Sequence, residues 1–422
     1  MKLSDKIQNI APSATLEIDS LAKKLKSEGE PVIAFVAGEP DFKTPDFIVD
    51  SAREALLNPA NFKYSPTGGL PELRKLIASR TTEQVKNQIE FNSKNVVVTN
   101  GGKQAVFETF AALLDEGDEV IAPKPLWLTY PEVIKFFGGK LKLVDDLSLE
   151  SLKAVVSDKT KFLLLNSPNN PSGQVLTEAE LKEIASFIKK TGIFVITDEI
   201  YMNLYYPENS YPANSQLSDE QDSRPIAPTL LNVSPEIQDQ TIIINGVAKS
   251  YAMTGWRVGW IVAPESIASA VISLQSHLTS NVNNIAQRAT LAALGDTDEN
   301  YQKSKDSIEE MRLAFLRRRD LICRELSKVQ TKDGKGRFTL SIPNGAFYAY
   351  VNVESLYGIP LGKDGDIVAS ASQLAKLILE KVLVACVPME AFETPGYLRF
   401  SYALADDEIV EGVSRIQKFI SE

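Results

Sequence analysis

The 422-residue sequence predicts an α/β protein with a mainly parallel sheet covered by helices on both faces. The first observation is a series of short, continuously apolar runs, which are typical of strands buried on both sides. The second is that longer segments with helical patterning separate these runs. The third is that glycine, asparagine and proline follow several runs, at the strand ends where parallel sheets bind their ligands.

Seven apolar runs predict the strands of this sheet. In chain order they are "NVVVT" (95–99), "DEVIA" (118–122), "KLKLV" (140–144), "KFLLLN" (161–166), "GIFVITDEI" (192–200), "TIIIN" (241–245) and "RVGWIVA" (257–263). We expect helices between them at 103–117, 130–139 and 177–190. The third of these helices opens with Thr177 and Glu180, which have the spacing of a capping box.

The C-terminal part of the chain predicts a second, smaller α/β domain. A long charged helix is expected over 301–329, and strand-like segments follow at 345–353, 382–388 and 397–403. The polar, proline-containing region 206–240 is predicted to be a surface excursion between two strands. We expect a large domain over 48–300 and a small domain formed by 1–47 together with 301–422.

Composition and charge exclude several classes of function. The net charge of −10 argues against a nucleic-acid or anionic-membrane partner. Two cysteines without metal-ligand spacing, together with the lack of an apolar signal or membrane segment, predict a cytoplasmic protein. His277 is the one histidine, which removes Ser-His-Asp hydrolysis and multi-histidine metal sites, so no metal is expected.

Lys249 stands out by its surroundings. Between Gly246 and Gly255 it is the only charged side chain among small, apolar and hydroxyl residues. A desolvated lysine has a lowered pKa and becomes a nucleophile toward carbonyl groups. A lysine that reaches the surface along its aliphatic stem would give the same pattern. Eight residues later, Arg257 supplies a permanently charged fork that suits a phosphate.

Other strand ends carry polar groups that would complete one site. Asp198 directly follows a buried run, so its carboxylate needs a helix end, a salt bridge or a cationic ring nitrogen as partner. Tyr201 and the Asn170 amide could serve a ring oxygen, although "SPNNPSG" alone is only a turn. The "NGGKQA" segment (100–105) is either a plain β–α turn or a phosphate-binding helix start. Together with an amine for an aldehyde, these groups suit pyridoxal 5′-phosphate.

Ordered motifs over nearly the whole chain carry a family resemblance. They are "AGEPDFKTP", "KYSPTGGLPELRKL", "NGGKQAVF", "PLWLTYPEVIKFFGG", "NSPNNPSG", "TDEIY", "NGVAKSYAMTGWRVGW", "NGAFYAY" and "YLRFSYA". With them the chain resembles the fold-type I pyridoxal-phosphate aminotransferases, and most closely the bacterial subgroup Ib aspartate aminotransferases. The resemblance implies the PLP-transferase fold type I, with a large domain around a seven-stranded sheet.

The resemblance implies roles around the cofactor ring. Lys249 would form the Schiff base with the cofactor, and Asp198 would keep the pyridine nitrogen protonated. Asn170 and Tyr201 would hydrogen-bond the ring oxygen, and Trp127 would stack on the ring.

It also implies roles around the phosphate and the substrate. Gly102 and Lys103, through their backbone N–H groups, and Arg257 would hold the phosphate. Tyr64 would reach the phosphate of the neighbouring subunit, which implies a homodimer. Arg399 would clamp the substrate α-carboxylate. The remaining substrate-pocket residues implied are Gly38, Trp127, Asn170, Ser13 and Thr15.

One departure from the family pattern concerns the phosphate. Gly246 and Ala248 stand where many relatives carry serine, so the turn at 101–103 is expected to hold more of the phosphate.

The implied activity is a two-step, ping-pong amino transfer between aspartate and 2-oxoglutarate. Glutamate–prephenate, aromatic or alanine specificity is the alternative within the same activity. A pyridoxal-phosphate C–S lyase or decarboxylase, and a non-catalytic aminotransferase-like regulator, are the alternatives outside it.

Overall fold

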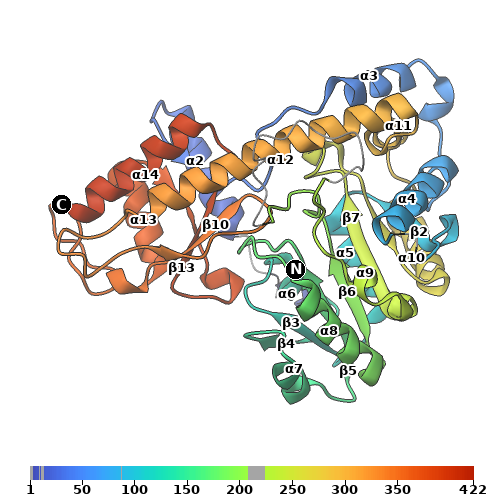
Figure 1. Ribbon diagram of the computed structural model, residues 1–422, viewed down its shortest axis with the longest axis horizontal. Coiled ribbons are helices and arrows are strands. Elements are labelled where there is room, and N and C mark those ends of the chain that lie inside the picture. The colour runs from blue at the N-terminus through green and yellow to red at the C-terminus, as the bar shows by residue number, and fades with distance from the viewer. Residues whose placement is uncertain (1–2, 9, 11–13, 87, 208–223) are drawn as a thin grey trace.

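The computed structural model describes residues 3–8, 10, 14–86, 88–207 and 224–422. Figure 1 shows two lobes, one around a large sheet and one around smaller sheets. Helix α12 (Asp298–Leu326) runs from the first lobe into the second.

The larger lobe is built on a seven-stranded sheet with the strand order β2-β8-β7-β6-β5-β3-β4. Its strands are β2 (Val96–Thr99), β3 (Glu119–Pro123), β4 (Lys140–Val144), β5 (Thr160–Asn166), β6 (Phe194–Asp198), β7 (Thr241–Gly246) and β8 (Gly259–Val262). Only β8 runs against its neighbours, and every other pairing is parallel. The predicted mainly parallel sheet is confirmed, and each of the seven apolar runs forms one of its strands.

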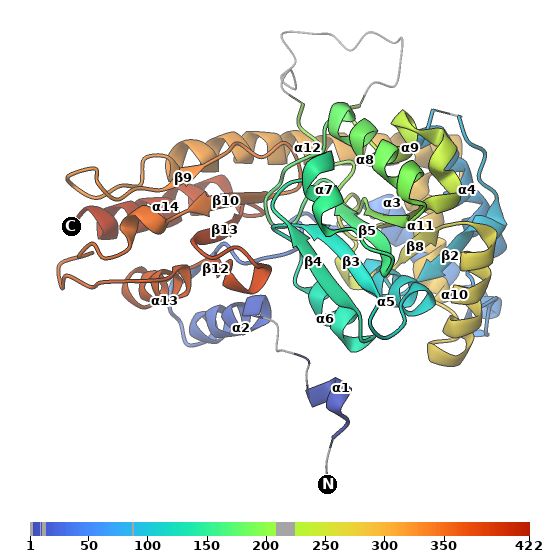
Figure 2. The same cartoon turned by 90° about the horizontal axis from the view of Figure 1, so that it is seen from below.

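Helices cover both faces of this sheet because successive strand residues point to opposite sides. In β5, Phe162 and Leu164 pack into one buried cluster, and Leu163 and Leu165 pack into another. The first face is covered by α5 (Gly102–Leu113), α6 (Thr129–Phe136) and α10 (Glu265–Leu278). The second is covered by α3 (Asp46–Ala55), α4 (Pro71–Gln84), α7 (Leu149–Val155), α8 (Glu178–Thr191), α9 (Leu230–Val233) and α11 (Asn284–Leu294). Figure 2 shows α7, α8 and α9 on one side and α5, α6 and α10 on the other.

Helix α8 shows how local sequence sets an element's limits. The Thr177 hydroxyl accepts from the backbone N–H of Glu180, whose carboxylate accepts from the backbone N–H of Thr177. This reciprocal capping box is the one predicted from the sequence. The helix ends at Gly192, whose φ of +74° is left-handed and suits glycine.

The smaller lobe combines a four-stranded antiparallel sheet with a two-stranded parallel one. The first has the order β12-β13-β10-β9, with β9 (Thr339–Leu340), β10 (Tyr348–Asn352), β12 (Val387–Pro388) and β13 (Tyr397–Ser401). The second pairs β1 (Ile33–Ala34) with β11 (Val384–Ala385). The N-terminal and C-terminal helices are α1 (Asp5–Gln8), α2 (Ala14–Ser27), α13 (Ala371–Val382) and α14 (Asp406–Ser421). Short 3-10 helices are η1 (Pro59–Phe62), η2 (Ser93–Asn95), η3 (Pro235–Gln240), η4 (Thr254–Trp256), η5 (Glu354–Leu356) and η6 (Glu390–Phe392).

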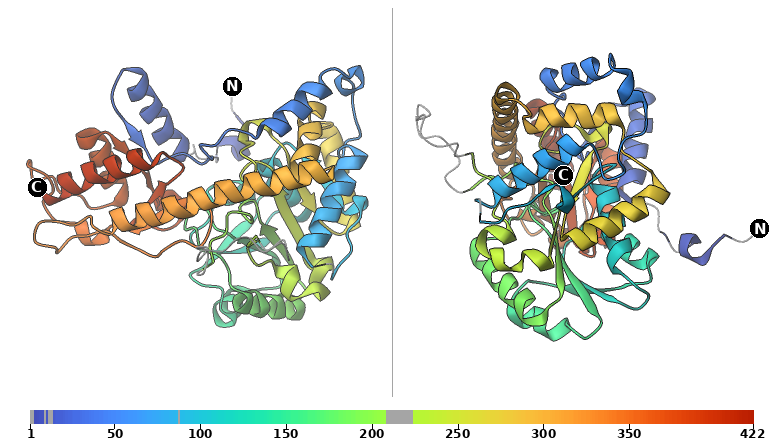
Figure 3. Two further views of the ribbon diagram at one scale, coloured as in Figure 1. Left: turned by 45° about the horizontal axis from the view of Figure 1, so that its top comes forward. Right: turned by 90° about the vertical axis from the view of Figure 1, so that its right-hand side faces the viewer.

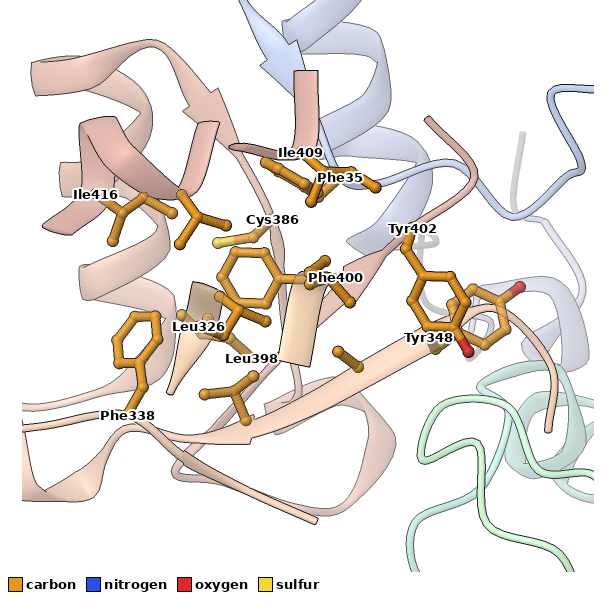
Figure 4. Close-up of a cluster of buried hydrophobic side chains, with 14 of the residues drawn as sticks. Phe35, Leu326, Phe338, Tyr348, Cys386, Leu398, Phe400, Tyr402, Ile409 and Ile416 are labelled. Carbon is orange, nitrogen blue, oxygen red and sulfur yellow. The ribbon is translucent and has the colours of Figure 1, made fainter. Parts of the chain in front are cut away.

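The core of the smaller lobe joins residues from distant parts of the chain. Phe35 from the N-terminal segment packs edge-to-face on Phe400 of β13, with 5.5 Å between ring centroids. Figure 4 shows this pair among Leu326, Cys386 and other buried side chains. The N-terminal segment is therefore part of this lobe's core.

Helix α12 ties the two lobes together. Its 29 residues span about 43 Å at 1.5 Å per residue. It packs on α11 at one end and on α14 at the other, as Figure 3 also shows. The long charged helix expected at 301–329 is therefore present, shifted by three residues.

The region 206–240 lies between β6 and β7, as expected, and residues 208–223 of it are outside the described part. Its last part was expected to be surface, but it forms α9 and η3, where Leu230, Leu231 and Ile237 are buried against the sheet. Across the residues that the structure describes, no helix is both long and apolar enough to cross a membrane.

Candidate active site

The candidate site lies where the carboxyl ends of five strands meet. Because β2 and β7 are both antiparallel to β8, they run in the same direction, and β3, β5 and β6 share that direction. Ligands bind beyond this edge of a parallel sheet. The predicted residues follow these strands: Gly102 and Lys103 follow β2, Trp127 follows β3, Asn170 follows β5, Asp198 and Tyr201 lie at and after the end of β6, and Lys249 follows β7.

Lys249 presents a partly buried amine to this edge. Its Nζ contacts the carbonyl oxygen of Gly38 and lies 5.7 Å from the centroid of the Tyr201 ring. Burial lowers the pKa of Lys249 to about 8, against the opposing charge of Glu39, and the guanidinium of Arg399 adds to the lowering. At pH 7 about a tenth of such an amine is neutral and able to act as a nucleophile or base.

Asp198 is the last residue of β6 and is only 5% exposed. Its Oδ2 accepts a hydrogen bond of 2.6 Å from the Tyr130 hydroxyl, and its Oδ1 accepts from the backbone N–H of Ile200 at 3.2 Å. Burial raises the pKa of Asp198 to about 6, while the Tyr130 and Ile200 hydrogen bonds and the charge of Lys249 oppose that rise. Its partner within the chain is therefore a phenol.

Tyr130 was not among the residues predicted from the sequence. It lies in "PLWLTY", three residues after Trp127, and its backbone N–H donates to the Trp127 carbonyl. The sequence feature that could have revealed Tyr130 is its spacing from Trp127. One helical turn places side chains i and i+3 on the same side, so Tyr130 could be expected near the site of Trp127.

Arg257 lies against the glycine turn that begins α5. Its guanidinium donates to the carbonyls of Thr254 (2.9 Å) and Asn100 (3.3 Å). Gly101 has a φ of +81°, and a Cβ there would lie 2.7 Å from Arg257 Nη2. The glycine therefore leaves room for the arginine beside the N-terminus of α5, where backbone N–H groups favour an anion.

A second glycine contact explains a departure from the family pattern. A Cβ on Gly246 would lie 2.9 Å from both the Cα of Gly259 and the carbonyl oxygen of Val258. On Gly259, a Cβ would lie 2.6 Å from the backbone nitrogen of Gly102. The backbones are packed too closely here for a β-carbon, which accounts for glycine at position 246.

Arg399 is a buried cation on β13, and only 2% of it is exposed. It donates to the side-chain oxygen of Asn170 (3.0 Å) and to the carbonyl of Val36 (3.1 Å). Its Nε has no hydrogen-bond partner among the described residues. A buried guanidinium with an unused donor is prepared for a carboxylate.

The hydroxyls of Tyr201 and Tyr348 are hydrogen-bonded at 2.8 Å. Tyr348, which was also not predicted, lies under the guanidinium of Arg399, 4.6 Å from ring centroid to Cζ. The two tyrosines therefore link the Asp198 side of the site to the Arg399 side.

Trp127 and Lys103 lie together at another side of the site. Lys103 Nζ is 5.0 Å from the centroid of the Trp127 ring. Burial and the nearby Arg257 lower the pKa of Lys103. Lys103 forms no ion pair within the described chain, so it joins Lys249, Arg257 and Arg399 as a cation of the site without an acidic ion-pair partner there.

Two residues considered in the sequence, Tyr64 and His277, lie on the surface of the described chain, and two others are not described there. Tyr64 is 91% exposed, and His277 is exposed near the end of α10. Ser13 lies outside the described residues, and the side chain of Thr15 is not described either.

Comparison with known proteins decides the family. The family model of aminotransferase class I and II matches residues 30–416. The aspartate aminotransferase of Streptomyces avermitilis is 47% identical over all of this chain and 97% of its own. The chain belongs to the class I and II aminotransferases. A probable aspartate/prephenate aminotransferase of Aquifex aeolicus is 42% identical over all of this chain and 99% of its own.

Solved structures place this aminotransferase in fold type I. The aspartate aminotransferase of Rhizobium meliloti superposes with a TM-score of 0.87, at 30% identity, over 100% of this chain and 99% of its own. That of Thermus thermophilus, solved with maleate, gives 0.84 at 32% identity over 99% of both chains. The predicted PLP-transferase fold is confirmed.

Pyridoxal 5′-phosphate is the cofactor of this aminotransferase family, and the residues present fit it. Gly101 leaves space beside Arg257 for a phosphate. A Cβ at position 101 would take up that space and collide with the guanidinium. The lowered pKa of Lys249 suits an amine that meets an aldehyde. The buried carboxylate of Asp198 suits a ring nitrogen that carries a proton.

Proposed function

We propose that this aminotransferase moves the amino group of aspartate to 2-oxoglutarate in a ping-pong cycle. The observation that carries the proposal is the place of the Lys249 amine. It lies within the electrostatic reach of Asp198, Arg257 and Arg399. Since Arg399 suits a carboxylate, a substrate held there would present its Cα to the amine.

We assign the cofactor contacts as follows. Asp198 would face the ring nitrogen, Asn170 and Tyr201 would donate to the ring oxygen, and Trp127 would stack on the ring. Arg257 and the backbone N–H groups of Gly102 and Lys103 hold the phosphate. Support comes from their placement after neighbouring parallel strands and from the cation at the start of α5.

Lys249 is assigned the proton transfer. Pyridoxal phosphate supplies an aldehyde for the amine and a ring that accepts the electron pair released at the substrate Cα. Lys249 Nζ removes the Cα proton as a base and returns a proton as an acid. Its pKa of about 8 suits both tasks near neutral pH.

A dicarboxylate substrate is supported by the number of unpaired cations in the site. Arg399 receives the α-carboxylate, with the Gly38 backbone beside it. The side chain of Lys103, which has no ion-pair partner within the described chain, is our candidate for the distal carboxylate. The relatives described above carry the name aspartate aminotransferase or aspartate/prephenate aminotransferase, which supports aspartate and makes prephenate the second oxo acid to test.

We further propose a homodimer with its sites at the interface. Tyr64 (91% exposed), Leu57 (83%) and Phe62 (61%) form a cluster of exposed apolar side chains in and around η1. Such a cluster is typical of a surface that another chain covers. On this proposal Tyr64 reaches the partner's phosphate.

We also propose the domain limits 48–300 for the large domain, and 1–47 with 301–422 for the small one. The seven-stranded sheet lies in the former range and the smaller sheets in the latter. The free, buried Cys323 and Cys386 support a cytoplasmic location.

The test is a panel of amino acids with 2-oxoglutarate, and of aspartate with prephenate, followed by identification of the oxo acids formed. Aspartate should give the highest kcat/KM, and Lys249→Ala should abolish turnover. Normal turnover by that variant, or borohydride trapping of the cofactor on another lysine, would refute the proposed mechanism.

A further inference from the structure

The hydrogen bond between Tyr130 and Asp198 has no role in the proposed cycle as described so far. The phenol oxygen lies 2.6 Å from Asp198 Oδ2, and the tyrosine is 1% exposed. A distance of 2.6 Å lies in the range of hydrogen bonds from a hydroxyl to an ionised carboxylate. It therefore bears on the charge state of Asp198.

Tyr130 is held in place for this contact. Its ring meets Trp127 edge-on, with 5.3 Å between centroids, and lies 6.4 Å from the ring of Phe110. Burial and the neighbouring Asp198 raise the pKa of Tyr130 well above its ordinary value. Because the phenol keeps its proton throughout the usable pH range, it is always a donor to the carboxylate.

We propose that Tyr130 is a positioning residue that keeps Asp198 ionised, so that the shared proton stays on the cofactor's ring nitrogen. This inference rests on the proposed place of Asp198 opposite that nitrogen. In a buried acid–base pair, the proton moves to the carboxylate when the carboxylate lacks other donors. A donated hydrogen bond favours the ionised acid, and a protonated ring is the better acceptor of electrons.

The other groups around Asp198 cannot replace this donor. The hydrogen bond from the backbone N–H of Ile200 to Asp198 is longer, at 3.2 Å. Lys249 loses its positive charge whenever its amine reacts or acts as a base. Tyr201 is in electrostatic reach, but its hydroxyl is hydrogen-bonded to that of Tyr348 and not to Asp198. Glu199 is itself a buried carboxyl, and burial together with the neighbouring Asp198 raises its pKa to about 7.

The test follows the protonation of the ring nitrogen directly. Holoenzyme is reconstituted with pyridoxal phosphate labelled with ¹⁵N in the ring, and the nitrogen signal is recorded against pH. Tyr130→Phe keeps the aromatic ring and removes only the donor. It should shift the proton distribution toward Asp198 by roughly 10- to 100-fold, or one to two pKa units. Tyr206→Phe is the matched control, because Tyr206 is equally buried and its hydroxyl donates to the Ala346 carbonyl in the smaller lobe.

A variant with 3-fluorotyrosine introduced at position 130 should shift the proton in the opposite direction, because its more acidic phenol is a stronger donor. This variant keeps the side-chain shape, so it decides the matter if Tyr130→Phe fails to fold. Asp198→Asn distinguishes the proposed place of Asp198 from the proposed role of Tyr130. If it leaves the ring nitrogen protonated, the proposed place of Asp198 is wrong. If it deprotonates the nitrogen but neither change at Tyr130 alters the signal, only the role of Tyr130 is refuted.

Discussion

Replacing Gly101 with alanine tests the phosphate cradle. The backbone there has φ +81° and ψ 167°, a region that only glycine occupies readily. The new Cβ would lie 2.7 Å from Arg257 Nη2, so the guanidinium must move away from the start of α5. The backbone strain alone costs about 1–3 kcal/mol of unfolding free energy.

The displacement of Arg257 adds a separate effect on cofactor binding. A hydrogen bond to a charged group contributes about 1.5–3 kcal/mol, so loss of one phosphate contact should weaken the cofactor by roughly 10- to 100-fold. The assay is an absorbance titration of the apoenzyme with pyridoxal phosphate and, in parallel, with pyridoxal, which lacks the phosphate. Only the former should bind more weakly.

The control for this experiment is Gly192→Ala. Gly192 also has a left-handed φ, +74°, but a Cβ there would meet no heavy atom within 4 Å. It should lose stability in urea denaturation while binding the cofactor normally. Unchanged pyridoxal phosphate affinity in Gly101→Ala, or an equal loss for pyridoxal, would show that the cradle does not hold the phosphate.

Three further changes address the substrate cations and a buried acid. Arg399→Lys gives up the planar fork, so kcat/KM should fall about 10- to 100-fold for aspartate and alanine alike; a fall for aspartate only would contradict the α-carboxylate assignment. Lys103→Gln should lower kcat/KM by a similar factor for aspartate but leave alanine little changed, as measured with the same panel. Glu108 is buried, its Oε2 has no partner among the described residues, and burial raises its pKa to about 7, although the Gln104 hydrogen bond opposes the rise. A carboxyl whose pKa is raised by folding stabilises the protein at low pH, and that stability is lost as pH rises from about 4.5 to 7. Glu108→Gln should therefore be about 1–3 kcal/mol more stable than wild type at pH 8 but no more stable at pH 4.5. Denaturant titrations at the two pH values measure the difference.

The sheet could be predicted from the sequence because its strands are buried on both faces. A run such as "KFLLLN" (161–166) has no polar side to disguise it, and it forms β5 (Thr160–Asn166). The structure of the region 206–240 was harder to predict. Its polar composition hid the short apolar stretch around Leu230 and Leu231, whose burial depends on the sheet and on α8.

The candidate site was partly visible in the sequence because polar groups at strand ends are unusual. Lys249 and Asp198 could be identified because each is a charged residue at or after the end of an apolar run. Tyr130 and Tyr348 could not, since an aromatic residue in an apolar segment looks like core until its hydroxyl's partner is known. Those partners, Asp198 and Tyr201, lie 68 and 147 residues away in the chain.

The hydrogen bond from Arg399 to Asn170 means that an incoming carboxylate must compete with an amide oxygen for the guanidinium. The amide oxygen takes up one arm of the guanidinium, so an incoming carboxylate displaces a neutral ligand instead of meeting a bare charge. A weakly bound anion gains little from that exchange, whereas a carboxylate that also engages the unpartnered Nε of Arg399 gains more. One contact would thereby disfavour stray anions and also hold the guanidinium in place for the substrate carboxylate.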